Sequence, residues 1–366
     1  MKTRFLLRAA SPVLMLALLS GTLMGRESRT RNVLTKADDS FFRTDSAMRV
    51  GLRLLDWQRN TGAWPKNVEM AVPLDDEARS RVLADKERRD DSTIDNRATT
   101  MQMKFLARLY RETHDARFRD AFLRGVKYLL DAQYDNGGWP QFWPETIGYQ
   151  EHITYNDDAM VRVMYVLRDI ASGTAPYDGD LVSGDMRRRA QEAFDKGIEC
   201  ILATQMECNG TLTVWCQQHD HVTLLPAPAR AYELPSYCTS ESASIVALLM
   251  ELPQPDQRVV RAVDAAMAWF ERTQLKGIRV EYVRGEDGKL ADVKVVKDAK
   301  ARPLWARFYD LKDCQPFFCD RDGIPRRNLS EIGFERRTGY GWYSGAPGEL
   351  KKQYKKFKKS LPKSVK

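Results

Sequence analysis

Two short polar segments hold the residue types best suited to binding a hard cation. Each lies just ahead of a run in which apolar residues recur every three or four positions, as at the start of a helix. An Asp there can be an ordinary helix cap, because its oxygens accept the free N–H groups of the first turn. If the two helix starts converge, their carboxylate and amide oxygens suit Ca²⁺ far better than Zn²⁺. The residues are Asp95-Asn96 and Asn156-Asp157-Asp158.

Aromatic residues beside these segments could bind a sugar. A glycine-rich turn at 136–138 precedes Trp139 and Trp143, and Trp215 follows another glycine-containing loop. Exposed aromatic rings are common in ligand sites, so these indoles could form a platform for sugar rings next to the cation. The alternative is that the indoles fill gaps between helices and have only a packing role.

One arginine lies in a loop that is stiffened by prolines. Arg230 follows Pro226 and Pro228 and precedes Pro235. A rigid loop loses little conformational entropy when it holds a guanidinium in place, and a guanidinium is a good partner for a substrate carboxylate. An isolated arginine is more often a surface or ion-paired residue, so this pattern alone does not assign a role.

A recurring unit positions these residues. Leu-Leu-Asp-x-Gln followed by Gly-x-Trp-Pro occurs twice, with weaker copies further on, and its glutamines at 58, 133, 205 and 274 are 75, 72 and 69 residues apart. Paired amphipathic helical patterns lie between the copies. Two helices in each repeat predict helical hairpins arranged in a ring. We therefore expect an all-α fold, an α/α toroid or incomplete barrel of hairpins whose loops converge on one face. A small β-hairpin at 278–296 decorates it.

The two ends of the chain differ from the repeat region. Residues 1–25 have the layout of a secretory signal peptide, with basic residues before a short apolar run. We expect 26–45 to be a disordered polar linker, 46–350 to be one α/α-toroid domain and 351–366 to be a basic tail. No segment is long and apolar enough to span a bilayer. The sequence thus predicts a secreted or periplasmic protein, and we expect a monomer.

The formal net charge of +8 resides in the C-terminal tail. Eight lysines and no acids follow position 350, so the rest of the chain has a net charge of 8 − 8 = 0. Such a tail can be solvated and frayed, or it can hold the protein near an anionic polymer or a membrane surface. No nucleic-acid-binding motif accompanies it, so a nucleic-acid partner is not predicted.

All six cysteines lie in the C-terminal half. Export permits disulfides, and the first four are close enough in sequence for one or two. A zinc site is disfavoured because no Cys-x-x-Cys occurs and only four histidines are present. The cysteines are at 200, 208, 216, 238, 314 and 319.

Together these motifs resemble those of the pectate lyases of polysaccharide lyase family ten. The resemblance runs from about Arg49 to Gly345, nearly all of the chain after the signal. One departure is Tyr237-Cys238-Thr239, where smaller residues are expected, and it affects the shape of a subsite rather than the chemistry. The motifs that carry the resemblance are GAWPK (62–66), TIDN (93–96), NGGWPQ (136–141), HITYNDDAM (152–160), VWCQQHD (214–220), ARAYELPS (229–236) and ERRTGYGWY (335–343).

The resemblance implies an enzyme that cleaves polygalacturonate, the pectin polymer, by β-elimination with Ca²⁺. By position, Asp95, Asn96 and Asp157 correspond to the region that binds calcium and the substrate carboxylate, and both acids count as catalytic. Arg230 corresponds to the proposed catalytic base. Arginine normally stays protonated, so Arg230 would need a lowered pKa or alkaline conditions. The residues expected to contact substrate are Asn96, Trp139, Trp143, Tyr149, Asn156, Trp215, His219 and Arg321.

Two other functions fit the same fold. A non-catalytic protein could bind acidic polysaccharide, and a glycoside hydrolase could use paired carboxylates as acid and base. Calcium dependence and an unsaturated product distinguish a lyase from both, because a hydrolase leaves saturated ends and a binding protein cleaves nothing.

Overall fold

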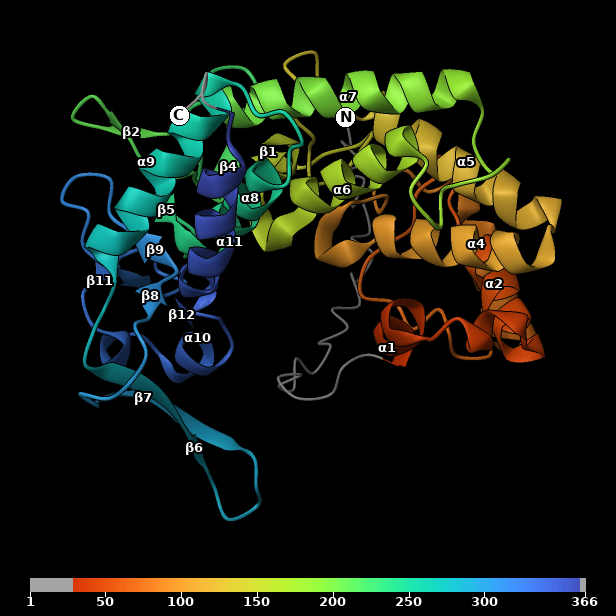
Figure 1. Ribbon diagram of the computed structural model, residues 1–366. Coiled ribbons are helices and arrows are strands. Elements are labelled where there is room, and N and C mark those ends of the chain that lie inside the picture. The colour runs from red at the N-terminus through yellow and green to blue at the C-terminus, as the bar shows by residue number, and fades with distance from the viewer. Residues whose placement is uncertain (1–28, 363–366) are drawn as a thin grey trace, which may run out of the picture.

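Three helical hairpins form the body of the protein in a computed structural model that describes residues 29–362 (Figure 1). In each hairpin an inner helix leads into an outer helix that packs against it. The inner helices contact one another in turn, and so do the outer helices, which gives two layers. This confirms the predicted α/α arrangement. The hairpins are α4 (Thr100–Thr113) with α5 (Ala116–Asp131), α6 (Ala159–Ser172) with α7 (Gly184–Ala203), and α8 (Thr239–Met250) with α9 (Gln257–Thr273).

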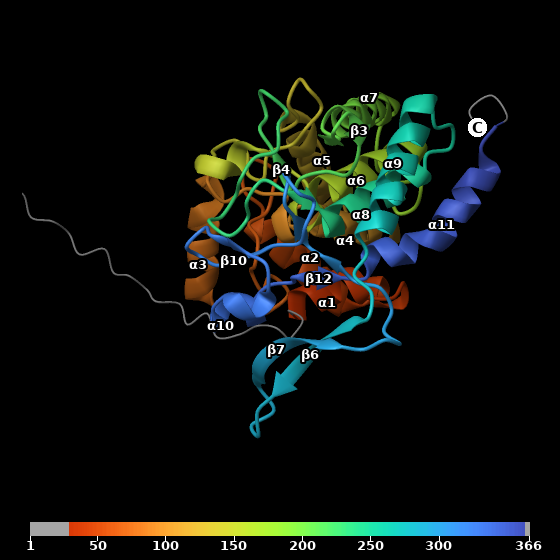
Figure 2. The ribbon, with the colours of Figure 1, turned by 90° about the vertical axis from the view of Figure 1, so that its left-hand side faces the viewer.

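Further helices extend the body at both ends. Before the first hairpin, α2 (Asp45–Trp57) packs against α4 and α5, and α3 (Asp76–Ala84) packs against α2. After the last hairpin, α11 (Ala346–Ser360) packs against α8. In Figure 2, α9 and α11 lie on one side of the molecule, and the loops that carry β4 and β10 lie on the opposite side.

The repeated glutamines join each outer helix to the next repeat. The side-chain amide of Gln58 donates to the backbone oxygens of Gly62, in its own loop, and Ala121, in the next outer helix, both at 2.8 Å. Gln274 bonds within its own turn, to Glu271, because α9 is the last outer helix. The repeat glutamines are therefore structural. The intermediate copies are Gln133 with Gly137 and Ala193, and Gln205 with Thr213 and Ala262.

The repeated tryptophans are buried, which corrects the predicted sugar platform. The side chains of Trp139 and Trp215 are 0% exposed, so neither can stack on a sugar. Each indole N–H donates at 2.7 Å to a carbonyl in the last turn of the preceding outer helix, an acceptor that the helix itself leaves free. The prediction was wrong for both residues because each indole is packed inside its repeat, where this hydrogen bond holds it. Trp64 and Trp305 make the equivalent bond in the first and fourth repeats.

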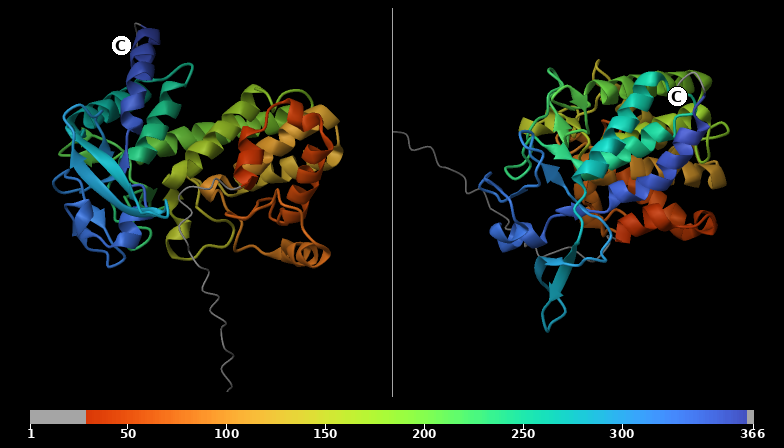
Figure 3. Two further views of the ribbon diagram at one scale, coloured as in Figure 1. Left: turned by 90° about the horizontal axis from the view of Figure 1, so that it is seen from below. Right: turned by 60° about the vertical axis from the view of Figure 1, so that its left-hand side comes forward.

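Short strands hold the loops together at one face. The predicted hairpin is present as β6 (Ile278–Arg284) and β7 (Leu290–Lys297), and it projects from the body (Figures 1 and 3). The other strands are two residues long and pair antiparallel; three pairs link segments far apart in the sequence, and two pairs close a turn within one loop. These pairs are β1 (Ile153–Thr154) with β4 (Gln218–His219), β2 (Glu207–Cys208) with β3 (Thr211–Leu212), β5 (Tyr237–Cys238) with β9 (Phe308–Tyr309), β8 (Trp305–Ala306) with β12 (Tyr343–Ser344), and β10 (Phe318–Cys319) with β11 (Pro325–Arg326).

Both flanking segments are more ordered than the sequence suggested. Part of the expected polar linker forms α1 (Arg29–Lys36), which buries Leu34, and a 3-10 turn that buries Phe42. The lysine-rich tail continues α11, where Phe357 is buried and Lys358 pairs with a carboxylate at 2.7 Å. Apolar residues at helical spacing therefore anchor both segments. The predicted signal peptide lies outside the described residues, and within 29–362 no helix is long and apolar enough to cross a membrane.

Candidate active site

Two turns of nearly identical backbone hold the predicted cation ligands. One is the 3-10 turn Asp95–Arg97 ahead of α4, and the other is Asn156–Asp158 ahead of α6. The angle φ is 50° at both Asn96 and Asp157, and it stays positive at the residue that follows each. Asn and Asp tolerate this left-handed conformation better than other residues with side chains. The two turns contact each other, so the helix starts converge as expected.

The first turn buries its carboxylate and exposes its amide. Asp95 is only 3% exposed, and Lys66 Nζ lies 2.5 Å from its Oδ2. Asn96 is exposed and its amide donates to Asn67 Oδ1 at 3.1 Å. Asp95 therefore already attracts a positive group. Lys66 belongs to a motif in the sequence, but its contact with Asp95 bridges 29 residues and was not predicted.

The second turn has the opposite arrangement, with a buried amide and an exposed carboxylate. Asn156 is 6% exposed and accepts a hydrogen bond from Gln217 Nε2 at 2.6 Å. The side chain of Asp157 is 44% exposed, and Arg307 Nη2 lies 3.4 Å from its Oδ1. One carboxylate of the pair of turns thus faces solvent while the other lies beneath the surface.

Arg307 and Glu241 form a buried ion pair under the second turn, and sequence reasoning missed both. Their side chains are 10% and 2% exposed. Burial alone would lower the pKa of Arg307, but the Glu241 carboxylate outweighs it and holds the pKa well above the ordinary value. Arg307 is therefore a fixed positive charge beside Asp157. The two residues are 66 positions apart, and no local pattern signals such a contact.

Arg230 forms a bidentate ion pair with a carboxylate three residues further on. Its Nε donates to Glu233 Oε2 at 2.7 Å and its Nη2 donates to Oε1. The Arg230 side chain is 43% exposed, whereas that of Glu233 is 3% exposed. Burial would lower the pKa of Arg230, but the hydrogen bonds and charge of Glu233 more than offset this and raise the pKa. The shift is opposite to what a base requires, so Arg230 is a cation in this state.

A chain of hydrogen bonds links the Arg230 loop to the second turn. The Tyr340 hydroxyl donates to Glu233 at 2.8 Å and accepts from Gln217 Nε2 at 3.4 Å, and Gln217 also donates to Asn156. Tyr149 adds a connection to the first turn. Its phenol is half buried, which raises its pKa; Arg230 opposes this shift, while Glu233 and Asp95 add to it. Tyr149 is therefore within electrostatic range of both Asp95 and Arg230.

Three further residues were predicted to contact substrate, namely His219, Trp143 and Arg321, and only the first is fully buried. His219 is 0% exposed, and both ring nitrogens bond to backbone groups, which corrects its predicted role. Burial lowers the pKa of His219 to about 4, so it is neutral at ordinary pH. Trp143 is half buried, with its ring edge-on to Tyr128. Arg321 is exposed and pairs with Glu335 at 3.1 Å.

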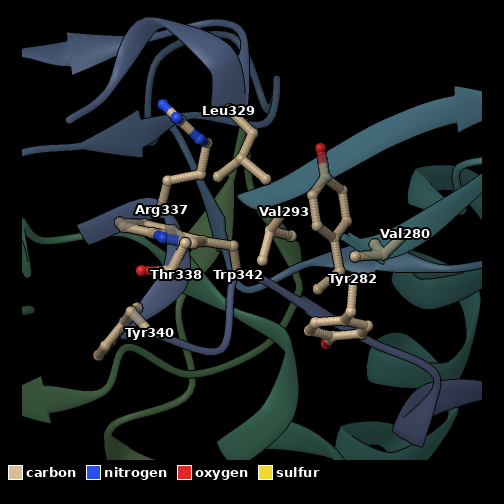
Figure 4. Close-up of a pocket in the computed structure, with 9 residues that line it drawn as sticks. Val280, Tyr282, Val293, Leu329, Arg337, Thr338, Tyr340 and Trp342 are labelled. Atoms are coloured by element: carbon tan, nitrogen blue, oxygen red, sulfur yellow. The ribbon is translucent and has the colours of Figure 1, made fainter. Parts of the chain in front are cut away.

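The small pocket in Figure 4 lies beside this network but is a different kind of site. It is lined mainly by apolar and aromatic side chains of the β6–β7 hairpin and of α10 (Phe334–Thr338) and the residues after it. Its one guanidinium, Arg337, pairs with Asp292 of β7 at 2.8 Å. This pocket has no free charge for an acidic ligand and instead marks where the hairpin is anchored.

Comparisons with known proteins identify the family. The profile of the pectic acid lyase family matches residues 58–350. The chain belongs to this family. It is also similar to solved structures of a family 10 polysaccharide lyase from Cellvibrio cellulosa, with 34% sequence identity. One of these has a TM-score of 0.75 and covers 91% of this chain and 95% of that chain. The other, a point mutant in complex with trigalacturonic acid, has a TM-score of 0.74 and covers 90% and 95%. No curated protein matches the chain.

The family membership confirms the resemblance inferred from the motifs and makes the protein a polysaccharide lyase. It removes the glycoside hydrolase reading, because the matched family and solved structures are lyases. In this lyase the face that carries Asp95, Asp157 and Arg230 is the candidate active site, since the two turns contact each other and hydrogen bonds link the Arg230 loop to the second turn.

Proposed function

We propose that this lyase cleaves polygalacturonate by β-elimination, with Ca²⁺ held by Asp95, Asn96 and Asp157. The observation that carries the proposal is the meeting of two acidic turns from successive repeats beside a fixed arginine network. Their donors are carboxylate and amide oxygens, which fit calcium. Asp95 already draws in the Nζ of Lys66 at 2.5 Å, so the site has the charge that attracts a cation. When bound, Ca²⁺ would neutralise negative charge on the uronate carboxylate as the C5 proton leaves.

The arginines would hold the acidic substrate in place. Arg307 is charged and only 10% exposed on its side chain, so it offers a rigid positive group beside Asp157. Arg321 lies at the exposed edge, with its guanidinium 5.8 Å from the centre of the Tyr232 ring, and Arg230 lies over the same ring at 5.0 Å. Each of these arginines pairs with a glutamate, so a uronate carboxylate would have to share the guanidinium with that glutamate or replace it.

The base step falls to Arg230 in this proposal. In the elimination a base removes the proton on C5, the C4–O bond breaks, a C4=C5 double bond forms, and the leaving oxygen takes up a proton. Arg230 can take the C5 proton only when it is neutral. Because Glu233 raises the pKa of Arg230, neutral Arg230 requires alkaline pH or a substrate that separates the pair. Activity should therefore rise with pH across the alkaline range.

The test is the appearance of the unsaturated uronate. Purified protein is incubated with polygalacturonate, with and without EDTA, and ultraviolet absorbance is followed between neutral and alkaline pH. We expect an absorbance rise that EDTA abolishes and calcium restores. Arg230→Lys should lower kcat/KM by about 10²–10⁴-fold, whereas Arg327→Lys, on a surface pair at the same face, should leave it unchanged. Polymer binding without any absorbance rise would mean that the fold serves binding alone.

The remaining expectations are part of the same proposal. We expect the lyase to act as an exported monomer from which residues 1–25 have been removed. Size-exclusion chromatography with light scattering gives the oligomeric state, and N-terminal sequencing of the protein from the periplasm or culture medium gives the cleavage point. An N-terminus at Met1 in the cytoplasmic fraction would overturn the export prediction.

A further inference from the structure

Two of the four histidines meet a carboxylate next to the paired strands β1 and β4. In this pair Ile153 lies opposite His219. Continuing the antiparallel register outward by two residues brings Glu151 opposite His221, with His152 next to them. One ligand atom from each of Glu151, His152 and His221 lies within 4.8 Å of the other two. The strand pairing therefore builds a compact cluster from two different loops.

One ring nitrogen of each histidine in this cluster makes no hydrogen bond within the described residues. The Nδ1 atoms of His152 and His221 are buried, and neither has a hydrogen-bond partner among the described residues. A buried polar atom without a partner costs free energy, and each such atom in a native structure calls for an explanation. His219, the neighbouring histidine, uses both of its ring nitrogens. The contrast marks His152 and His221 as residues with lone pairs available for a ligand.

Surrounding contacts fix the backbone of the cluster. The Tyr134 hydroxyl donates to the backbone oxygen of Glu151 at 2.8 Å, and the Asn136 amide donates to that of His221 at 2.7 Å. The Tyr134 ring also stacks on the His221 ring, with centroids 4.9 Å apart. One turn of the chain thus holds both strand ends. Such outer contacts are what orients the ligands of a metal site.

We propose that Glu151, His152 and His221 bind a divalent transition-metal ion of the zinc class. Two imidazoles and one carboxylate are the ligand types that Zn²⁺ takes, and three protein ligands leave a fourth position for water. Calcium prefers oxygen ligands and would not compete here. The ion would tie β1 to β4 and fix the 3-10 turn Gly148–Glu151, which carries Tyr149.

This proposal departs from the sequence-based expectation, which disfavoured a zinc site. That expectation rested on the absence of Cys-x-x-Cys and on the small number of histidines. The ligands here come from two loops 69 or 70 positions apart in sequence, and only the strand pairing brings them together. The proposal does not depend on the calcium chemistry of the active site, since the two clusters use different donor atoms.

Metal binding by the full-length mature protein tests the site directly. Protein without a histidine tag is treated with chelator, dialysed, and titrated with ZnCl₂ in the calorimeter in the presence of excess CaCl₂. We expect one molar equivalent of zinc to bind. CoCl₂ should give visible absorption bands, because the spectrum of bound Co²⁺ depends on its nitrogen and oxygen ligands. These bands should disappear when zinc displaces the cobalt. His152→Gln and His221→Gln should each weaken zinc binding at least about tenfold.

Control variants separate loss of the zinc site from loss of folding. His114→Asn removes an exposed histidine outside the cluster and should leave zinc binding unchanged. Asparagine is suitable at this position because it tolerates the φ of 52° found there. Glu151 is exposed, so Glu151→Gln can be made without disturbing the core if a histidine variant fails to fold. Zinc binding that persists at full strength in all three cluster variants, or no binding to the wild type, would overturn the proposal.

A separate observation concerns two thiols from distant parts of the chain. The Sγ atoms of Cys208, in β2, and Cys314 are 3.7 Å apart although 106 residues separate them. Both are half buried, whereas the other four cysteines are buried. The contact lies beside Tyr237, whose hydroxyl donates to the backbone oxygen of Glu207 at 3.2 Å. The pairing differs from the expectation that disulfides would form among the first four cysteines.

We infer that Cys208 and Cys314 form a disulfide when the protein meets a disulfide-bearing oxidant. The two thiols lose two protons and two electrons as the Sγ–Sγ bond forms, and the oxidant's own disulfide is reduced to two thiols. The bond would join the β2–β3 hairpin to the turn after β9. Because it closes a long loop, it should raise the melting temperature by several degrees.

Mass spectrometry of the mature protein tests this bond. After equilibration with oxidised glutathione, the thiols counted in denaturant should fall from six to four. Non-reducing digestion should give one linked peptide that contains Cys208 and Cys314. Cys208→Ser and Cys314→Ser should each abolish the bond and the gain in melting temperature, and Cys319→Ser should retain both. Six free thiols after oxidation, or a different linked pair, would overturn the inference.

Discussion

The turns Asp95–Arg97 and Asn156–Asp158 share a backbone but exchange their side chains. At the second position of each turn, φ and ψ are 50° and 34° in one case and 50° and 33° in the other. The buried first position is Asp in one turn and Asn in the other, and the exposed second position is Asn and then Asp. The internal repeat has therefore kept the conformation and changed where the charge sits.

The surroundings of each buried position explain which residue it accepts. Asp95 can be charged because Lys66 Nζ lies against it at 2.5 Å. Asn156 lies among Gln217, Arg307 and Glu241, where the arginine is already neutralised by the glutamate. A second carboxylate there would have no partner cation of its own, and burying an unpaired charge is costly. The neutral amide is the residue that this position can hold.

We expect the largest effect on stability from removing the ion pair under the second turn. Arg307→Met leaves Glu241 buried at 2% exposure without a cation, so we expect the free energy of unfolding to fall by about 3–5 kcal/mol. Urea denaturation followed by circular dichroism measures this. Lys66→Met, at the first turn, should cost less, because loss of the 29% exposed Lys66 side chain opens a path for water to Asp95, whose own side chain is 4% exposed.

The double variant Arg307→Met, Glu241→Leu is the control for that experiment. It removes both charges, so it should recover much of the lost stability if the penalty comes from an unpaired Glu241. A double variant as unstable as the single one would show that the second turn depends on packing rather than on charge balance.

These turns also show how much of the protein could be predicted. The glutamine spacing and the helical patterns were enough for the hairpins, because local periodicity and repeats carry that information. Asp95, Asn96, Asp157 and Arg230 could be singled out because each lies at a helix start or in a proline-bounded loop, and their roles stay predictions. Whether an indole points inward is decided by contacts with the next repeat, so Trp139 was misjudged. Arg307 was missed for the same reason.

Exchanging the acid and the amide of the second turn tests whether their order matters for activity. Asp157→Asn should lower kcat/KM by about 10²–10³-fold, because it removes the exposed carboxylate assigned to calcium. Adding Asn156→Asp gives this turn the residue order of the first turn, yet we expect no recovery, since the new carboxylate is buried beside Glu241. The ultraviolet assay with a calcium titration measures both variants.

Asp169→Asn serves as the matched control for the exchange. It removes the same charge at the far end of α6, where Asp169 pairs with Arg168 at 2.9 Å, and it should leave kcat/KM and the calcium requirement unchanged. Recovery of activity in the exchanged double variant would mean that the order of acid and amide is unimportant and that only the total charge of the two turns matters.

The smallest expected effect tests the backbone equivalence itself. Asn96→Ala and Asp157→Ala place a residue without a polar side chain at φ of 50°, which should cost about 1–2 kcal/mol of folding stability at each turn. Asn96→Gly and Asp157→Gly should be closer to neutral, because glycine adopts this conformation without a steric penalty. Denaturation of the four variants gives two alanine–glycine differences. Equal alanine–glycine differences in the free energy of unfolding would mean that both turns carry the same backbone strain. A difference at one turn alone would show that the other turn relaxes when its residue is replaced, so that the two turns are alike only in the native backbone.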